Sequence, residues 1–462
     1  MVFSSTLFLF LFLPIVLFAY YAVSPLRYKN SLLLIASLLF YSWGEPTNIL
    51  VMLLSIIINW CLALLIQKHQ KENNLQNTLF ISSILFNLGI LFYFKYIDFF
   101  IENLNSLFHC DIQKTNVALP IGISFFTFQA LSYIIDVKRN KIPVQRNLLD
   151  LGLYISFFPQ LIAGPIVRYI DIKEQIQKRS IDIQKFNEGC IRFMAGFSKK
   201  ILIADQLSPY IGKIFLAHGI SAPTAWLGAV AFTLQIYFDF SGYSDMAIGL
   251  GKMFGFDFLE NFNYPYISKS IKEFWRRWHI SLSQWFRDYV YIPLGGSRVR
   301  KSRLIGNLFV VWFLTGFWHG ASWNFIFWGL YYFAFLVLEQ SPLGKILRKM
   351  PRATQHTYAI SVFLIGWIFF RESGLKEAFT YIQNLFTINE NTWIDFIYTI
   401  DEKFIFCTFI GILFSTPIIP FIKNRIGKKT EIVFTVLTYA TFIVAIAFLL
   451  GAGFSPFLYF RF

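Results

Sequence analysis

Two histidines in different surroundings are the residues of this chain best suited to chemistry. His279 lies in the basic, tryptophan-rich stretch FWRRWHISLSQWFRDY, and His319 ends an apolar run and is followed by GASW. Hydrocarbon disfavours the charged form of a histidine, and the neutral ring can act as a general base. Ionisable residues within membranes are functional by default, although a core histidine bonded to a backbone carbonyl is the structural alternative. We expect His319 to be catalytic, with Gly316 and Gly320 leaving room for a substrate.

The stretch around His279 has the pattern of one amphipathic helix lying at the cytoplasmic face of a membrane. Its apolar face at helical spacing consists of Trp275, Trp278, Leu282, Trp285 and Tyr289. Arg276, Ser283 and Arg287 lie on the other face. The arginines could anchor the helix on lipid phosphates, or they could attract a phosphorylated cofactor such as a nucleotide thioester. The pattern leaves both interpretations open.

Two carboxylates, Asp239 and Asp245, lie within the apolar run QIYFDFSGYSDMAIGLG. Carboxylates at such depth pair with cations, orient a histidine or carry protons. We favour structural pairing with a buried lysine or arginine.

The chain ends in the aromatic sequence FSPFLYFRF. Chain ends usually fray, but a tail this aromatic is poorly suited to water. Tyr459 supplies a phenol that a neighbouring base could convert into a nucleophile.

The composition assigns the chain to the membrane proteins. Of 462 residues, 56% are hydrophobic and only 15% are charged, whereas soluble domains are nearer 25% charged. The net charge of +15 resides in short loops between apolar runs, where the positive-inside rule places it, so we expect no nucleic-acid partner. The four cysteines have no metal-ligand spacing, and we expect no metal site.

Eleven apolar runs are candidate crossings of a membrane. They are residues 7–23, 32–43, 49–66, 79–94, 121–137, 226–250, 304–318, 325–338, 358–370, 404–422 and 432–450. Residues 151–167 contain Pro159, Gly164 and Pro165, which predicts a broken or re-entrant segment. No linker or repeat interrupts the chain, so we expect one integral-membrane domain over residues 1–462.

The loop charges predict the orientation of the chain in the membrane. Residues 269–303 carry nine Lys and Arg against Glu273 and Asp288, which indicates the cytoplasmic side. Residues 371–403 carry six acidic against three basic residues, which indicates the opposite face.

Five segments resemble the membrane-bound O-acyltransferase family. They are LPIGISFFTFQALSYIIDV (119–137), FFPQLIAGPIVR (157–168), YFDFSGYSDMAIGLGKMFGF (237–256), RRWHISLSQWFRDYVYIPLGGSR (276–298) and GFWHGASWNFIFWG (316–329). The match is to the bacterial alginate and peptidoglycan O-acetyltransferase branch, and the chain looks most like the peptidoglycan O-acetyltransferase membrane component. It extends over nearly the whole sequence.

The resemblance implies an all-α polytopic fold with about eleven transmembrane helices, plus re-entrant and interfacial helices, around a central tunnel. The family's essential histidine matches His319, and its supporting position matches His279. Residues 457–462 fit the acyl-carrier motif F-x-Y-F-x-F, in which Tyr459 would hold the acyl group.

The same resemblance implies an O-acetyltransferase of the bacterial inner membrane with acetyl-CoA as acyl donor and no permanently bound cofactor. The residues expected to bind the donor are Arg276, Arg277, Trp278 and Arg287. A periplasmic serine-dependent partner of the SGNH type would collect the acetyl group and acetylate a cell-wall polysaccharide such as peptidoglycan.

Three other functions remain open at this point. The acceptor could be alginate or another exopolysaccharide. An acyltransferase could also act directly on lipid or protein. A glycan or lipid transporter would share the intramembrane Asp and His, but it would more often show an inverted repeat, and none is visible here.

Overall fold

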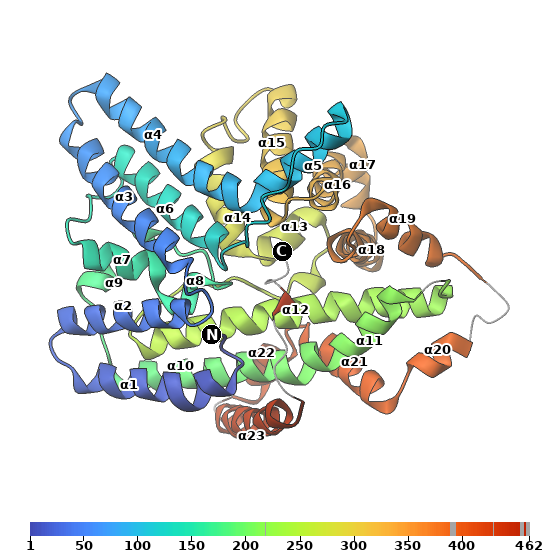
Figure 1. The fold of residues 1–462 in the computed structure, drawn as a ribbon. Coiled ribbons are helices and arrows are strands. Elements are labelled where there is room, and N and C mark those ends of the chain that lie inside the picture. The colour runs from blue at the N-terminus through green and yellow to red at the C-terminus, as the bar shows by residue number, and fades with distance from the viewer. Residues whose placement is uncertain (218, 389–393, 428, 453–456, 459–462) are drawn as a thin grey trace. The chain divides into compact units, whose positions relative to one another are not determined.

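In the computed structural model, the described residues (1–217, 219–388, 394–427, 429–452 and 457–458) form helices and connecting segments and contain no strand (Figure 1). A helix satisfies its backbone N–H and C=O groups within its own segment, which is necessary where water is absent. The all-α class predicted from the sequence is confirmed.

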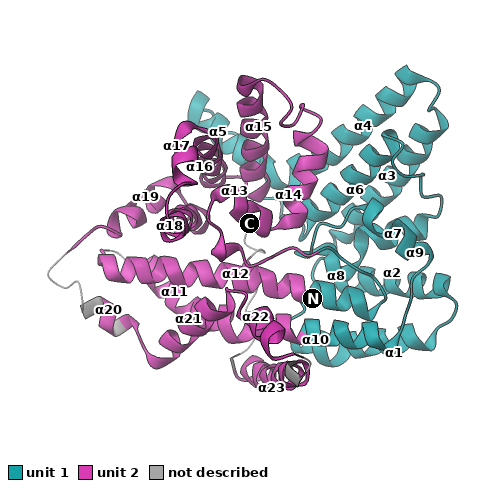
Figure 2. Ribbon diagram, turned by 180° about the vertical axis from the view of Figure 1, so that it is seen from behind, with its two compact units in different colours: residues 1–193, 246–259 teal, residues 194–245, 260–462 magenta. Residues whose placement is uncertain are grey.

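The chain divides into two compact units (Figure 2). Unit 1 contains residues 1–193 and 246–259, and unit 2 contains residues 194–245 and 260–462. Helices α10 (Ile183–Lys199) and α12 (Ala222–Met253) each contribute residues to both units. Because this division interleaves the sequence, the single domain expected over residues 1–462 stays a prediction.

A cluster of aromatic rings lies in the core of unit 1. Phe40 lies 5.9 Å from Phe8 and 5.4 Å from Phe158, measured between ring centroids. The remaining helices of this unit are η1 (Phe8–Phe12), α1 (Leu13–Ala22), α2 (Leu26–Ser42), α3 (Ile49–Lys68), α4 (Asn73–Leu91), η2 (Phe92–Tyr96), α5 (Ile97–Phe108), α6 (Ile123–Lys138), α7 (Leu148–Ser156), α8 (Phe158–Leu161) and α9 (Tyr169–Gln177).

The predicted break within residues 151–167 is present. Helix α7 ends at Ser156, Phe157 has ψ 111°, and the four-residue α8 follows. All residues from 151 to 167 are buried. Irregular backbone at membrane depth is tolerated only where protein or a cavity covers it, and here it lies inside unit 1.

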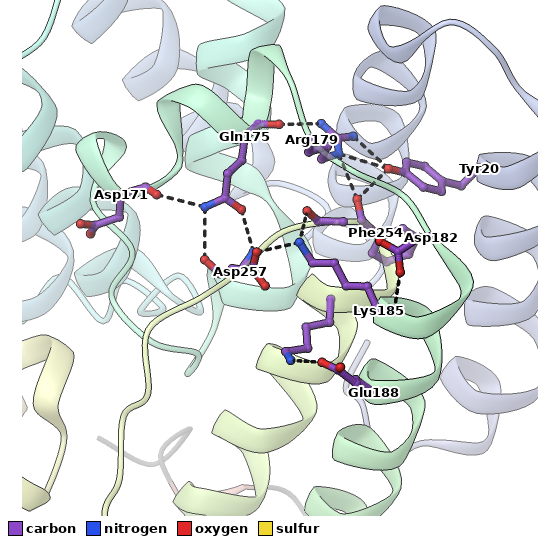
Figure 3. Close-up of polar contacts among 11 residues, drawn as sticks. Tyr20, Asp171, Gln175, Arg179, Asp182, Lys185, Glu188, Phe254 and Asp257 are labelled. Atoms are coloured by element: carbon purple, nitrogen blue, oxygen red, sulfur yellow. Dashed lines mark hydrogen bonds and ion pairs between the residues drawn. The ribbon is translucent and has the colours of Figure 1, made fainter.

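A polar network fastens the segment after α12 within unit 1 (Figure 3). The carbonyl of Phe254 accepts hydrogen bonds from the Tyr20 hydroxyl (2.7 Å) and from Nε of Arg179 (3.0 Å). Lys185 Nζ donates to Asp257 Oδ2 at 2.7 Å. These contacts join α1, α10 and the segment that follows α12 within unit 1.

Unit 2 contains the aromatic residues of both histidine motifs. Trp328, Tyr332 and Trp367 are among its fully buried side chains. Its other helices are η3 (Lys200–Ala204), α11 (Asp205–Leu216), η4 (Pro265–Ile267), α13 (Ile271–Arg277), α14 (Ile280–Phe286), η5 (Arg287–Tyr291), α15 (Lys301–His319), α16 (Trp323–Gln340), α17 (Pro342–Leu347), α18 (Arg352–Arg371), α19 (Leu375–Asn384), α20 (Ile394–Thr399), α21 (Glu402–Phe414), α22 (Ile418–Ile426) and α23 (Lys429–Ala452).

Several helices are long and apolar enough to cross a membrane. Among the described residues these are Ile49–Lys68, Asn73–Phe108, Arg352–Arg371 and Glu431–Gly451. The pair α21 and α22 adds a fifth span, bent by 61°, if the two helices cross together. The polytopic class is confirmed, whereas the number of eleven crossings stays a prediction.

Candidate active site

His279 occupies a break between two short helices of unit 2. Helix α13 ends at Arg277, α14 begins at Ile280, and His279 lies in the left-handed region with φ 43°. The backbone carbonyl of Asn261 accepts a hydrogen bond from the N–H of Ile280 (3.0 Å). The side-chain Oδ1 of Asn261 accepts one from the N–H of Ser281 (3.2 Å). These bonds satisfy the first N–H groups of α14 from outside the helix. The prediction of one continuous helix is therefore wrong at this point.

The same amide determines which nitrogen of His279 carries the hydrogen. A backbone N–H can only donate, so the Asn261 atom that faces Ser281 N is the amide oxygen. His279 Nδ1 lies 3.1 Å from this oxygen and must donate to it, which leaves the lone pair on Nε2. Burial lowers the pKa of His279 to about 3, because the charged ring would lose its hydration. His279 is thus a neutral ring whose Nε2 can accept a hydrogen bond.

His319 is the last residue of α15 and is 6% exposed. Its ring packs edge-on against Trp318 and Trp328, both at 4.9 Å between centroids, and against Phe370 at 5.3 Å. The carboxyl end of a helix carries partial negative charge, which stabilises positive charge that develops on a ring taking up a proton. This position suits the general base expected from the sequence.

Trp318 brings the two histidines into one cluster. Its ring centroid lies 6.3 Å from that of His279 and 4.9 Å from that of His319. Phe240 of α12 also packs edge-on against His279, at 4.8 Å between centroids. The structure thus places both predicted histidines in unit 2 around a shared indole, while the catalytic role of each ring stays a prediction.

A cavity of about 220 Å³ lies beside His279. It is lined by Lys272, Trp275, Arg276, His279, Leu282, Ser283, Phe286, Arg287, Tyr291, Leu308, Val311, Trp312, Thr315 and Leu336. The side chains of Lys272, Arg276 and Arg287 are exposed, whereas His279 is 1% exposed. The cavity therefore joins cationic groups at the surface to a buried neutral imidazole.

Two of the four residues expected to bind the donor line this cavity. Arg276 and Arg287 do so, and Arg287 also pairs with Asp288 at 2.7 Å. Lys272 is a third cationic group of the lining, which the sequence did not single out.

The other two expected donor-binding residues lie elsewhere. Arg277 donates to Glu273 (3.0 Å) and to the carbonyl of Asn263 (3.1 Å). Trp278 is 3% exposed and packs 4.7 Å from Trp367. Successive helical residues are about 100° apart around the axis, which explains why Arg276 and Arg277 diverge.

The tryptophans of the predicted apolar face are buried in unit 2. Trp275 packs 5.5 Å from Trp328, and Trp285 packs 5.1 Å from Tyr289. All five residues of the predicted apolar face are buried, but they are divided between separate short helices and contact protein. An interfacial anchor would present its indoles to lipid at headgroup depth, so the packing argues against the anchoring interpretation.

The glycines near His319 are packing residues. A Cβ on Gly316 would overlap the carbonyl oxygen of Phe325, and one on Gly320 would overlap the Phe325 ring. On the facing helix, a Cβ on Gly329 would overlap the carbonyl oxygen of Trp312. Small residues of this kind let two helices approach closely. The expected room for a substrate beside these glycines is therefore wrong, because α16 fills it.

The intramembrane carboxylates have cationic partners, as predicted. Asp239 pairs with Lys200 at 2.7 Å, and Asp245 pairs with Lys199 at 2.5 Å. Tyr459 lies outside the described residues, whereas Phe457 and Leu458 of the same motif are described and buried.

Asn261, like Lys272, is a residue of the site that reasoning from the sequence missed. It lies in the irregular segment between α12 and η4, and it is completely buried. Its importance comes from contacts with a segment eighteen residues further along the chain. No periodicity or motif in ENFNYP signals those contacts.

Comparison with known proteins gives a family and several relatives. The sequence profile described as "MBOAT, membrane-bound O-acyltransferase family" matches residues 38–376. The probable alginate O-acetylase AlgI of Azotobacter vinelandii is 44% identical over 399 residues, which cover 86% of this chain and 80% of that protein.

Two further relatives extend this comparison. The probable alginate O-acetylase AlgI of Pseudomonas putida is 39% identical over the full length of both chains. The peptidoglycan O-acetyltransferase of Helicobacter pylori is 35% identical over 426 residues, which cover 84% of this chain and 80% of that protein.

Proposed function

The chain belongs to the membrane-bound O-acyltransferase family and is an acyltransferase enzyme, and we propose that it takes acetyl from cytoplasmic acetyl-CoA and passes it outward through an ester on Tyr459. A periplasmic serine-dependent partner of the SGNH type then transfers the acetyl group to a polysaccharide. The enzyme would act as a multi-pass protein of the bacterial inner membrane.

The cavity beside His279 is the observation that carries this proposal. Its exposed Lys272 and Arg276 suit the phosphates of a nucleotide thioester, and its apolar walls suit the thioester arm. No salt bridge engages Arg276 within the described residues, so its guanidinium is available to a phosphate. With the phosphates of acetyl-CoA bound at these cations, its acyl end would extend toward the buried imidazole of His279.

The proposed step is acyl transfer from sulfur to oxygen. His319 takes the phenol proton of Tyr459 as the oxygen attacks the thioester carbonyl. The C–S bond then breaks, and the leaving thiolate takes the proton back from His319. The product is an aryl acetate that remains activated for a second transfer.

His279 is assigned a supporting role because of its tautomer. With Nδ1–H committed to Asn261, Nε2 cannot donate a hydrogen bond to the thioester carbonyl. A ring whose pKa is about 3 is also a weak base at neutral pH. We therefore assign its Nε2 to orienting a donor group, and we leave the proton transfer to His319.

This scheme keeps the charged donor in the cytoplasm. Only a two-carbon acyl unit crosses, whereas moving the phosphates of acetyl-CoA through hydrocarbon would carry a large desolvation cost. The proposal requires a passage that joins both aqueous sides to the histidine cluster.

Two polysaccharides are candidates for the final acceptor. The sequence motifs favoured peptidoglycan, and the relative named peptidoglycan O-acetyltransferase supports it. The relatives named alginate O-acetylase have higher identity, 39% and 44%, and they support alginate or a similar exopolysaccharide. Acetyl analysis of both polymers in cells that express or lack the enzyme distinguishes the two.

The acyl-acceptor role is tested by mass analysis of the C-terminal peptide after brief incubation of the purified enzyme with acetyl-CoA. We expect an added acetyl group on Tyr459 in the wild type and none in Tyr459→Phe. His319→Ala should lower the rate of labelling by about 10²–10⁴-fold, the usual contribution of a general base. Labelling of Tyr459 at an unchanged rate in His319→Ala would overturn the role of the histidine.

The donor site is tested in the same assay by comparing two neighbouring arginines. Arg276→Ala should raise the acetyl-CoA concentration needed for half-maximal labelling by about tenfold or more, the value of a charge-assisted hydrogen bond. Arg277→Ala should have a smaller effect, because Arg277 is paired with Glu273. An equal effect of both variants would argue against this cavity as the donor site.

A further inference from the structure

A buried ion cluster in unit 2 contacts the last described residues of the chain. Lys200 of η3 is 1% exposed, and its Nζ lies 2.7 Å from Asp239 Oδ1 and 2.5 Å from Asp205 Oδ1. Two carboxylates therefore face one ammonium group, and the second oxygen of Asp239 remains available to another donor.

That donor comes from the C-terminal segment. The backbone N–H of Leu458 donates to Asp239 Oδ2 at 2.8 Å. The Nζ of Lys200 lies 4.6 Å from the ring centroid of Phe457, within the range of a cation–π interaction. Tyr243 of α12 packs edge-on against the same ring at 4.7 Å. Phe457 is 1% exposed and Leu458 is 9% exposed.

These contacts differ from those of an ordinary chain end, which frays unless something holds it. A backbone N–H bonded to an ionised carboxylate forms a short, charge-assisted bond. Asp239 binds the lysine with one oxygen and the tail with the other, and Lys200 contacts both Asp239 and the Phe457 ring. The Lys200–Asp239 pair, Phe457 and Leu458 therefore form one connected cluster.

We propose that the Lys200–Asp239 pair is the docking site of the chain's own C-terminal segment and a positioning device for acyl transfer; this purpose rests on the proposed function. Tyr459 follows Leu458 directly, with about 3.8 Å between successive Cα atoms. The contacts that hold the backbone of Leu458 are therefore adjacent in the sequence to the proposed acyl acceptor. Asp239 and Lys200 are positioning residues, because they act through the tail.

The variant Asp239→Asn tests the docking site. Lys200 and the Leu458 N–H contact different oxygens of Asp239. In the amide one of these oxygens is replaced by NH₂, so one of the two donors would face another donor. The matched control is Asp205→Asn, which changes the other carboxylate of Lys200 and leaves the Asp239 Oδ2–Leu458 bond in place.

The measurement is the rate at which carboxypeptidase Y shortens the purified full-length enzyme, followed by intact mass. Asp239→Asn should accelerate cleavage into the docked segment by about 10- to 100-fold, as expected for the loss of one hydrogen bond to a charged group. Asp205→Asn should be cleaved at nearly the wild-type rate. Equal acceleration in both variants, or none in Asp239→Asn, would overturn the proposal.

Phe457→Leu is a second variant for the case that Asp239→Asn does not fold. It removes the ring from Lys200 but keeps an apolar side chain and the Lys200–Asp239 pair, so we expect this variant to fold. We expect severalfold faster cleavage, in proportion to a cation–π contact. Wild-type resistance in Phe457→Leu would contradict docking of this ring.

A kinetic readout separates positioning from general structural support. Asp239→Asn should lower the maximal rate of Tyr459 acetylation and leave the half-saturating acetyl-CoA concentration unchanged, because the donor cavity is not altered. A change in the half-saturating concentration alone would overturn the positioning role. If Asp239→Asn frees the tail while the wild type shows no acetyl ester, docking is supported and the acyl-acceptor role of Tyr459 fails.

Discussion

At the scale of single residues, the chemistry of His279 depends on one amide. Asn261 Oδ1 accepts from the Ser281 N–H, the Ser281 hydroxyl and His279 Nδ1. This set of contacts holds a histidine in the left-handed region, which non-glycine residues seldom occupy. The backbone strain is thus found at the point where the ring is oriented, as is frequent at functional sites.

Two substitutions of His279 separate its backbone role from its side-chain role. His279→Asn should fold well, because asparagine tolerates the left-handed region, but it has no atom at the position of Nε2. His279→Gln should be less stable, by about 1 kcal/mol, but it offers an acceptor near that position. We therefore expect the Gln variant to retain more acetyl transfer and the Asn variant to have the higher melting temperature.

Thermal unfolding in detergent and the initial rate of transfer from acetyl-CoA measure the two effects. A more active Asn variant would mean that Nε2 is not the functional atom of His279.

At the scale of helices, the α15–α16 pair positions His319. The two backbones meet at Gly316 and Gly329, where no side chain separates them. His319 lies less than one turn beyond Gly316, and its ring packs on Trp328, the residue before Gly329. The closeness of the helices therefore sets the distance between the His319 ring and its aromatic surroundings.

Gly316→Ala should destabilise the enzyme by at least about 2 kcal/mol and reduce its activity, because the added methyl group would meet the backbone of Phe325. The matched control is Gly306→Ala on the same helix, since no described atom lies within 4 Å of a Cβ there. That variant should be neutral, or more stable by up to about 1 kcal/mol, because alanine favours helix. Melting temperatures that shift equally in both variants would contradict close packing at Gly316.

At the scale of the whole molecule, the acetyl-transfer scheme depends on the side of the membrane that each loop faces. The charges predict that residues 269–303, which contribute most of the lining of the cavity beside His279, face the cytoplasm and that residues 371–403 face the outside. Ser297 and Lys376 are exposed members of these two segments.

The orientation is tested in a chain whose four native cysteines are replaced by alanine. A membrane-impermeant maleimide should label Lys376→Cys in intact spheroplasts, and it should label Ser297→Cys only after permeabilisation. Labelling of Ser297→Cys from outside would place the donor cavity on the side that lacks acetyl-CoA, and the transfer scheme would fail.

The sequence alone determined that this is a membrane protein, because segments buried in lipid must be rich in apolar residues and poor in charged ones. Eleven apolar runs, a proline-broken segment and two histidine motifs were visible without coordinates. The pairing of Asp239 and Asp245 with lysines was also predictable, since an unpaired carboxylate at that depth would carry a large desolvation cost.

Only the tertiary structure decided how these residues meet. The helix break at His279 depends on Asn261, which lies on another segment, and helical periodicity cannot report a bond from outside the helix. The divergence of Arg276 and Arg277, the filled space at Gly316 and the docking of Leu458 on Asp239 likewise follow from packing between distant parts of the chain. Sequence patterns show which segments must be buried in lipid or protein and which polar groups require a partner. The tertiary structure determines which distant segment supplies that partner.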